Sequence, residues 1–242
     1  ANMVNTMLEA VAAELRPHLQ ATILMSILSN HGPDNLVTAK VALPLEALST
    51  AKINGTLVAS KIAAASRIAQ LDPYRAVTHN KGIMNGITAA ALAFGNDFRA
   101  IESAAHAFAV RNGQYRGLSQ WQVRAKTLQG ELTLPLPVGF VGGATKALPA
   151  VKPNQRLAHI DSAEELMQVL CALGLAQNLA ALKALVTTGI QQGHMALQVK
   201  SLAISAGAST DEVLPLSNAL KHAEALDLTT AKQLLHALRQ RR

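Results

Sequence analysis

The residues of this chain that are best suited to chemistry lie in two short segments, 78–86 and 95–99. The first segment carries Lys81 between two amides, and the second carries Asp97. Only 15% of the chain is Asp, Glu, Lys or Arg, so charges within an apolar stretch need an explanation. Such groups are either exposed or paired, because burying them unpaired costs roughly 2–7 kcal/mol. Lys81 is therefore either a solvated lysine near a helix start or part of a functional site, where perturbed ionisable groups cluster.

Residues 79–86 are His-Asn-Lys-Gly-Ile-Met-Asn-Gly, and residues 95–102 are Gly-Asn-Asp-Phe-Arg-Ala-Ile-Glu. Further motifs lie at residues 4–7, 27–30, 113–119, 141–146, 174–182 and 193–197. In sequence and in order, these motifs closely resemble those of the class II (bacterial-type) HMG-CoA reductases. The resemblance extends from the first residue nearly to the last.

This resemblance implies an oxidoreductase that converts HMG-CoA and two reduced nicotinamides (NADPH or NADH) into mevalonate and CoA, or that catalyses the reverse reaction. The forward reaction has three demands. A thioester carbonyl must be polarised for hydride attack, the departing CoA thiolate must be protonated, and an intermediate aldehyde must be held for a second reduction.

Three residues match the family's catalytic positions. By resemblance, Lys81 stabilises negative charge that develops on the carbonyl oxygen only in the transition state. Asp97 is expected to hold and tune this lysine, because a nearby carboxylate favours the charged ammonium. His194 is expected to protonate the leaving thiolate, since a histidine titrates in the useful range and this one precedes a predicted helix. Without its Gly-His-Met-Ala context, His194 would be interpreted as structural.

The resemblance also implies substrate-binding residues. Arg75 is expected to grip the terminal carboxylate of the HMG group, because a guanidinium offers two parallel donors. The alternative for Arg75 is a solvated arginine in a loop. The amides of Asn85 and Asn30 are expected to bind substrate or neighbouring site residues, and Thr78 and Gln177 are further candidates.

Part of the family's machinery has no counterpart in this sequence. The sequence opens inside the family's Asp-Ala-Met-Gly-Ala-Asn nicotinamide motif, so Asn2 is the one candidate cofactor-binding residue. In the family, the catalytic glutamate and the residue that selects between the two nicotinamides both precede this point. We therefore expect a fragment that binds little cofactor and turns over little by itself. No metal site is predicted.

Charge, cysteine content and hydrophobicity argue against two classes of partner, nucleic acids and membranes. The net charge is +7, but the basic residues are scattered without an aromatic-interleaved stripe, so no nucleic-acid partner is predicted. The basic C-terminal cluster is interpreted as a solvated tail, with a CoA phosphate partner as the alternative.

Cys171 is the only cysteine, which suits a reducing cytoplasm, and its apolar neighbours favour core packing. Apolar stretches such as 87–94 fall short of the roughly 18 residues of a membrane span, so no membrane association is predicted.

We predict an α+β fold that is predominantly helical, because the chain is half apolar, rich in alanine and poor in aromatic residues. Helices are predicted over 4–19, 57–70, 83–94, 98–111, 162–173, 175–185, 195–205 and 229–238, with another that begins at Asp211. Strands are predicted over 21–28 and 37–43, and a hairpin over 118–127 and 131–140 with its turn at Gln129-Gly130. Residues 75–82 are predicted to form a loop.

The family combines a small cofactor domain, inserted in a large substrate domain, with a mobile C-terminal flap. By resemblance, residues 1–29 are the tail of the small domain and residues 30–187 belong to the large substrate-binding and dimerisation domain. Residues 188–242 correspond to the flap. Gly189 and Gly193 are candidate hinges, because glycine absorbs backbone changes at low cost.

The spacing of Lys81 and Asp97 bears on how a pocket is assembled. If one straight helix joined them, their Cα atoms would lie about 24 Å apart along its axis. Either the helix is broken, for instance at Gly86, or each pocket combines residues of two subunits. The second option agrees with the family, whose sites lie at a homodimer interface.

Two other function classes remain open from the sequence. One is a non-catalytic CoA-binding or dimerisation fragment that retains the fold. The other is a helical nucleic-acid binder, for which only the positive charge speaks.

Overall fold

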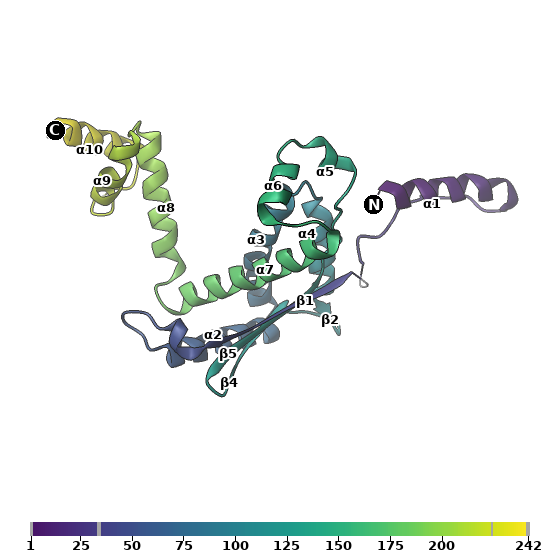
Figure 1. Ribbon diagram of the computed structural model, residues 1–242, viewed down its shortest axis with the longest axis horizontal. Coiled ribbons are helices and arrows are strands. Elements are labelled where there is room, and N and C mark those ends of the chain that lie inside the picture. Colours follow the sequence, from purple (N-terminus) through teal and green to yellow (C-terminus); the bar gives the residue numbers. More distant parts are fainter. Residues whose placement is uncertain (1, 33–34, 224, 241–242) are drawn as a thin grey trace. The chain divides into compact units, whose positions relative to one another are not determined.

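The computed structural model describes residues 2–32, 35–223 and 225–240. Its fold is α+β and predominantly helical, as predicted (Figure 1). The chain divides into two compact units, Ala1–Leu182 and Lys183–Arg242. The first unit holds α1 (Asn2–Leu15), η1 (Arg16–His18), β1 (Leu36–Pro44), η2 (Leu45–Leu48), α2 (Gly55–Leu71), α3 (Pro73–Ala93), α4 (Phe98–Phe108), β2 (Val110–Arg111), β3 (Gln114–Tyr115), β4 (Ser119–Arg124), β5 (Thr127–Pro135), α5 (Gly143–Ala147), α6 (Val151–Ala158) and most of α7 (Ala163–Val186). The second holds the end of α7, α8 (Ile190–Ser205), α9 (Thr210–Leu220) and α10 (Leu228–Gln240).

A three-stranded antiparallel sheet lies at the centre of the first unit, in the order β1-β5-β4. On its inner face, Leu128, Leu132 and Leu134 of β5 are fully buried. Trp121 of β4 pairs with Gly130 of β5, where a side chain would collide with the indole ring. The glycine therefore lets the ring cover the middle strand of the sheet.

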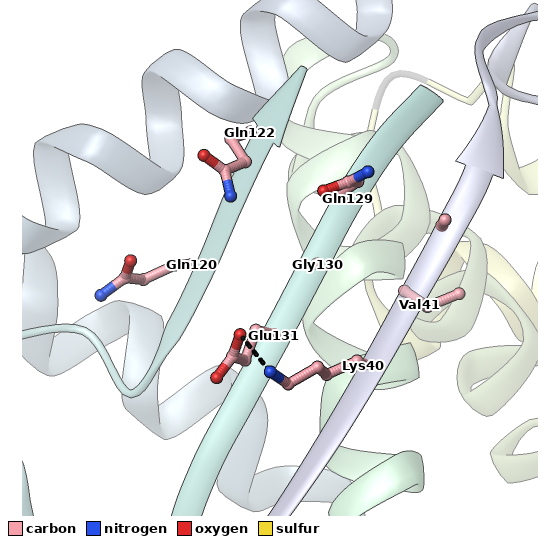
Figure 2. A pocket seen from close by; sticks show the side chains of 8 residues that line it. Lys40, Val41, Gln120, Gln122, Gln129, Gly130 and Glu131 are labelled. Carbon is pink, nitrogen blue, oxygen red and sulfur yellow. Dashed lines mark ion pairs between the residues drawn. The ribbon is translucent and has the colours of Figure 1, made fainter. Parts of the chain in front are cut away.

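The outer face of the same sheet is polar (Figure 2). Lys40 of β1 pairs with Glu131 of β5 at 3.2 Å, and both side chains are largely exposed. Gln120, Gln122 and Gln129 extend this polar face around a shallow hollow of about 270 Å³. The alternation predicted for residues 37–43 is thus confirmed, since β1 alternates between half-buried and exposed residues.

Asp72 joins α2 to α3 and caps both helices. Its backbone N–H donates to the Ile68 carbonyl at the end of α2, and its carboxylate accepts from the Tyr74 N–H at 3.0 Å. Pro73 occupies the first position of α3, where a backbone N–H would have no helical partner. The predicted loop over 75–82 is therefore wrong, because the Asp-Pro pair that ends one helix also starts the next.

Two further predictions about strands are corrected by the structure. Residues 21–28 form no strand, and Leu24 and Ile27 are exposed, because no neighbouring strand pairs with this segment in the described part of the chain. The β4–β5 hairpin exists, but its turn lies at residues 125–126 rather than at Gln129-Gly130. Its second strand is the central strand of the sheet and ends at Pro135, earlier than the predicted residue 140, because proline lacks the N–H that a longer ladder would need.

Helix α7 is longer than predicted, since it continues through Gly174. A Cβ at Gly174 would lie 2.7 Å from Cδ1 of Ile87 and 3.1 Å from Cδ2 of Leu132. This glycine therefore permits close packing against α3 and β5 instead of ending a helix.

By length and composition alone α7 could span a membrane, contrary to the prediction that the apolar stretches of the sequence are too short for a span. One such helix is weak evidence of a span, and α7 buries Leu166, Leu170 and Asn178 in the first unit.

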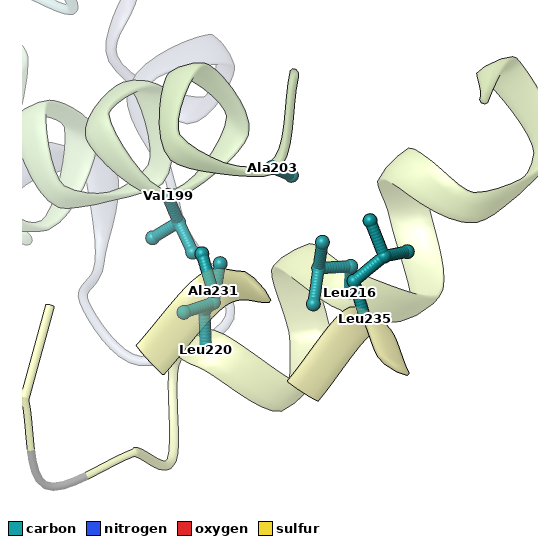
Figure 3. Packing of buried hydrophobic residues seen from close by; sticks show 6 residues of the cluster. All are labelled: Val199, Ala203, Leu216, Leu220, Ala231 and Leu235. Atoms are coloured by element: carbon teal, nitrogen blue, oxygen red, sulfur yellow. The ribbon is translucent and has the colours of Figure 1, made fainter. Parts of the chain in front are cut away.

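The second unit has its own apolar core, formed where α8, α9 and α10 meet (Figure 3). The core residues are Val199, Ala203, Leu216, Leu220, Ala231 and Leu235. Helix α9 begins at Thr210 with Ser209 rather than Asp211 as its N-cap, because Ser209 and Glu212 form a capping box. Pro215 consequently lies inside the helix rather than in its first turn.

Candidate active site

One exposed face of α3 carries four of the predicted site residues. Arg75, Thr78, Lys81 and Asn85 recur at spacings of three or four residues, so they follow one another along a single side of the helix. Thr78, Lys81 and Asn85 are exposed, and Arg75 is half-buried. We call these four residues the site face of α3.

Gln177 on α7 lies close to this face. A Cβ added at Gly86 would lie 3.3 Å from Cβ of Gln177, so the two helices approach closely at this level. Gly86 directly follows Asn85, and Gln177 is half-buried there. The tertiary structure therefore brings a fifth predicted site residue next to the site face.

Asp97 does not join Lys81 within one chain. Helix α3 runs unbroken past Gly86 to Ala93, so Lys81 lies roughly 18 Å along the axis from the end of the helix. A break at Gly86, one of the two options above, is thus wrong. Asp97 caps α4 instead, accepting from the N–H groups of Arg99 and Ala100 at 3.1 and 3.2 Å. No ion pair between Lys81 and Asp97 occurs among the described residues.

Asp97 lies on an open hollow of about 540 Å³ between the α3–α4 turn and the glycine-rich segment near α5. Asn96 ties the two walls together, since its side-chain oxygen accepts from the Gly139 N–H at 2.6 Å. Gly95 adopts φ 67°, and a Cβ there would press on Val151 and Ala144. The close approach explains why glycine occupies this helix stop.

The remaining predicted site residues are not brought to the site face by any described contact. Asn30 is exposed in the irregular segment before β1. His194 belongs to α8 and Asn2 to α1, but their side chains lie outside the described part of the structure. The structure therefore gathers Arg75, Thr78, Lys81, Asn85 and Gln177 and leaves the other four predicted residues untested or apart.

A buried polar network behind the site face is the feature that the sequence did not reveal. His79 Nε2 lies 2.7 Å from Ser119 Oγ, and Ser119 Oγ donates to Asn178 Oδ1 at 2.8 Å. The indole N–H of Trp121 donates to the same oxygen at 2.7 Å. Burial, and secondarily the charge of Arg75, lower the pKa of His79 to about 4. This histidine is consequently neutral at physiological pH.

Asn80 extends the polar contacts from the same side of α3. Its side-chain nitrogen donates to the Arg116 carbonyl at 2.9 Å, and its oxygen accepts from the Leu118 N–H at 2.8 Å. The sequence signal for these buried roles is the pair of polar residues directly before Lys81, since the helical spacing turns both of them away from the direction of Lys81.

The described residues offer no group of three or more His, Cys, Asp or Glu side chains that could hold a metal ion. They also do not assemble a nicotinamide site, because the single candidate residue, Asn2, lies outside the described side chains. What the site face provides is an ammonium, a guanidinium and amide groups, which suit an anionic or carbonyl-bearing substrate.

Comparisons with known proteins identify the family of the chain. The family model of hydroxymethylglutaryl-coenzyme A reductase matches residues 1–199. The 3-hydroxy-3-methylglutaryl-coenzyme A reductase of Archaeoglobus fulgidus is 43% identical over 240 residues, which cover 99% of this chain and 54% of that protein. The probable reductase of Borreliella burgdorferi is 37% identical over 202 residues, covering 84% of this chain and 47% of the relative.

Solved structures give the same result. A class II reductase from Streptococcus pneumoniae, bound to NADPH in open conformations, matches with a TM-score of 0.72 and 53% identity. The match covers 99% of this chain and 58% of that one. Another structure of the enzyme from the same organism gives a TM-score of 0.71 and 52% identity.

The α+β fold is that of the reductase structures that the chain matches. The chain belongs to the hydroxymethylglutaryl-coenzyme A reductase family. It spans about half the length of the curated relatives that it matches.

Proposed function

We propose that this chain forms the substrate-binding portion of an oxidoreductase that reduces HMG-CoA to mevalonate and CoA with two NADPH or NADH, or that catalyses the reverse reaction. Family membership supports the reaction. The observation that carries the proposal is the exposed site face of α3, with Lys81 at its centre. A lysine held on a rigid helix is suited to a charge that develops at one fixed point.

Each residue of the site face has a role that follows from its chemistry. Lys81 donates to the thioester oxygen as negative charge builds there. Arg75 binds the terminal carboxylate of the HMG group through two parallel hydrogen bonds. Asn85, with Thr78 and Gln177 beside it, donates or accepts hydrogen bonds that orient the acyl group.

Two further roles come from residues outside the site face. His194 protonates the departing CoA thiolate, and Asn30 contributes an amide to the substrate pocket. Gly189, at φ 79° just before α8, is the hinge that lets the segment carrying His194 move.

The proposed domains follow the family's layout. Residues 188–242 act as the flap, residues 30–187 as the large domain and residues 1–29 as the tail of the cofactor domain. Asn2 contributes to nicotinamide binding, and the chain's described residues add no further part of that site.

The working unit is a homodimer with its active sites at the subunit interface. Lys81 and Asp97 do not pair within one chain, so the Asp97 that tunes Lys81 comes from the partner. Apolar side chains beside the site face support a covering subunit, since Tyr74 is 89% exposed and Val77 and Leu92 are more than half exposed. We place the protein in the cytoplasm, with neither a membrane nor a nucleic acid as a partner.

The test is an assay of the longest native form of the protein that contains this chain, with HMG-CoA and each reduced nicotinamide. Lys81→Ala should lower kcat by about 10²–10³-fold, because it removes a donor to the transition-state oxygen. His194→Ala should lower thioester reduction more than reduction of the free aldehyde. Binding of CoA without any turnover by the wild type would instead support a non-catalytic CoA-binding fragment.

A further inference from the structure

Three elements of the first unit meet at a set of buried polar side chains that are hydrogen-bonded to one another. His79 comes from α3, Ser119 and Trp121 come from β4, and Asn178 comes from α7. All four are at least 96% buried. We call them the His79 network.

The chemistry of the side chains fixes the direction of two of these hydrogen bonds. Trp121 can only donate, so Asn178 Oδ1 accepts from its indole N–H and from the Ser119 hydroxyl. His79 Nε2 lies 2.7 Å from Ser119 Oγ and 3.3 Å from the side-chain nitrogen of Asn178. The imidazole of His79 therefore links α3 to both β4 and α7. A protonated ring would place an unpaired charge in the core.

The network determines how α3 is rotated about its axis. Successive helical residues are about 100° apart, so Lys81 points away from the core when His79 points into it. Asn80 adds a second constraint, because its amide bonds to the backbone of residues 116 and 118. Gln70 of α2 holds the same segment from the other side, donating to the carbonyls of Gly117 and Ser119 at 2.9 and 3.0 Å.

The two ends of the network each adjoin a residue of the proposed site. His79 is two residues before Lys81 on α3, and Asn178 directly follows Gln177 on α7. Apolar packing alone would tolerate small rotations of α3, whereas hydrogen bonds with fixed directions do not.

We propose that the His79 network is a positioning device for catalysis: His79 and Asn178 are positioning residues that lock α3 and α7 in register, so that Lys81 and Gln177 meet the same substrate. This inference rests on the proposed function. The inference goes beyond the proposed function by assigning a role to side chains that touch no substrate.

The experiment compares two variants that each remove a buried hydrogen bond. In one variant the bond involves a residue of α3, and in the other it does not. His79→Leu breaks the network, His79→Gln restores a hydrogen-bonding amide near the position of Nε2, and Ser66→Ala is the matched control. Ser66 is 2% exposed and its hydroxyl accepts from the Trp121 N–H at 3.0 Å, but it lies on α2. Kinetics are measured on the longest native form of the protein, and stability is measured by denaturant unfolding.

We expect His79→Leu to lower kcat by at least about tenfold with little change in KM for HMG-CoA, because misplacement of a catalytic group by a fraction of an ångström mainly affects the transition state. His79→Gln should recover most of the loss, and Ser66→Ala should keep the wild-type kcat. Equal effects of His79→Leu and Ser66→Ala on kcat at equal loss of stability would overturn the proposal. If His79→Leu does not fold, Asn178→Asp, which keeps the Oδ1 acceptor, replaces it under the same criteria.

A second measurement is independent of catalysis. In NMR spectra of the protein, His79→Leu should shift the side-chain amide resonances of Asn85 and Gln177, and Ser66→Ala should leave both unchanged. The indole N–H of Trp121, the only tryptophan, reports whether the network is intact. If the wild type does not reduce HMG-CoA but these shifts occur, the proposed function fails and the positioning role stands. Unchanged amide resonances in His79→Leu would refute the positioning role itself.

Discussion

His79 and Lys81 leave α3 on opposite sides, although a single residue separates them. His79 is 2% exposed and is hydrogen-bonded to β4, whereas Lys81 is exposed on the site face. One buried and one exposed polar group within a single helical turn give the helix a fixed orientation. The burial of His79 against β4 thus fixes the side of α3 on which Lys81 lies.

The stability of the protein should fall as the pH is lowered from about 6.5 to 4. The pKa of His79 is about 4 in the folded protein and 6.5 in an unfolded chain, so the unfolded state binds a proton first. The contribution is fully present above pH 6.5, and about 3 kcal/mol is lost once the pH is below 4. The loss is measured as the change in the free energy of unfolding, by denaturant unfolding at a series of pH values.

His79→Gln supplies the control for this pH dependence. Glutamine does not titrate, so the difference in unfolding free energy between variant and wild type should change by about 3 kcal/mol over the same range. A difference that stays constant from pH 7 to pH 4 would show that His79 is not buried in its neutral form.

Gly174→Ala should destabilise the first unit by about 1–3 kcal/mol, because overpacking forces buried side chains from their preferred positions. The new Cβ would lie 2.7 Å from Ile87 and 3.1 Å from Leu132. Gly82→Ala is the matched control in a helix, since nothing lies within 4 Å of its Cβ. It should stabilise the protein by about 0.5–1 kcal/mol through backbone entropy. A neutral Gly174→Ala in thermal unfolding would contradict the close packing of α7.

Cys171 should resist alkylation until the protein unfolds. Burial raises the pKa of its thiol to about 11, and the thiol lies 3.5 Å from the Leu132 carbonyl. Because the thiolate is the reactive form, the native protein at pH 8 should react with iodoacetamide at least about 100-fold more slowly than the denatured protein. Cys171 is the only cysteine, so the mass of the adduct reports on it alone. Equal rates in the two states would place this side chain at the surface.

Arg239→Lys should destabilise the second unit, particularly at neutral pH. Arg239 donates to both carboxylate oxygens of Glu212 at 2.9 and 2.8 Å, and these bonds hold the pKa of Glu212 well below its usual range. The depressed pKa means that the contribution is present above about pH 4.5 and is lost as the pH falls. Lysine cannot reproduce the two parallel bonds.

The exposed pair Lys40 and Glu131 provides the comparison for Arg239. Lys40→Ala should change the unfolding free energy by less than about 0.5 kcal/mol, since exposed ion pairs contribute little. Hydrogen exchange of the amides of α9 and α10, measured at pH 7 and at pH 3, reports on the second unit. Equal protection in Arg239→Lys and wild type at pH 7 would count against the role of this pair.

Local signals in the sequence predicted many elements correctly. The alternation of residues 37–43 gave β1, and the glycine at 95 gave the stop between α3 and α4. The predicted helix boundaries were wrong where the same residue type can either end a helix or serve another purpose. The loop predicted over 75–82 is helical because Asp72-Pro73 starts α3, and the helices predicted over 162–173 and 175–185 are one helix because Gly174 is a packing contact. The choice depends on what lies across from the residue, which may be a hundred positions away in the chain, as Asn178 is from His79.

The sequence by itself determined the family, the α+β class and the identity of the residues with chemical capacity, because these depend on residue types and their order. Only the tertiary structure decided that Thr78, Lys81 and Asn85 share one exposed face, that His79 serves the core, and that Lys81 and Asp97 stay apart within the chain. The physical reason is that a helix's rotation and length are set by side chains from other elements, and no local pattern encodes those contacts.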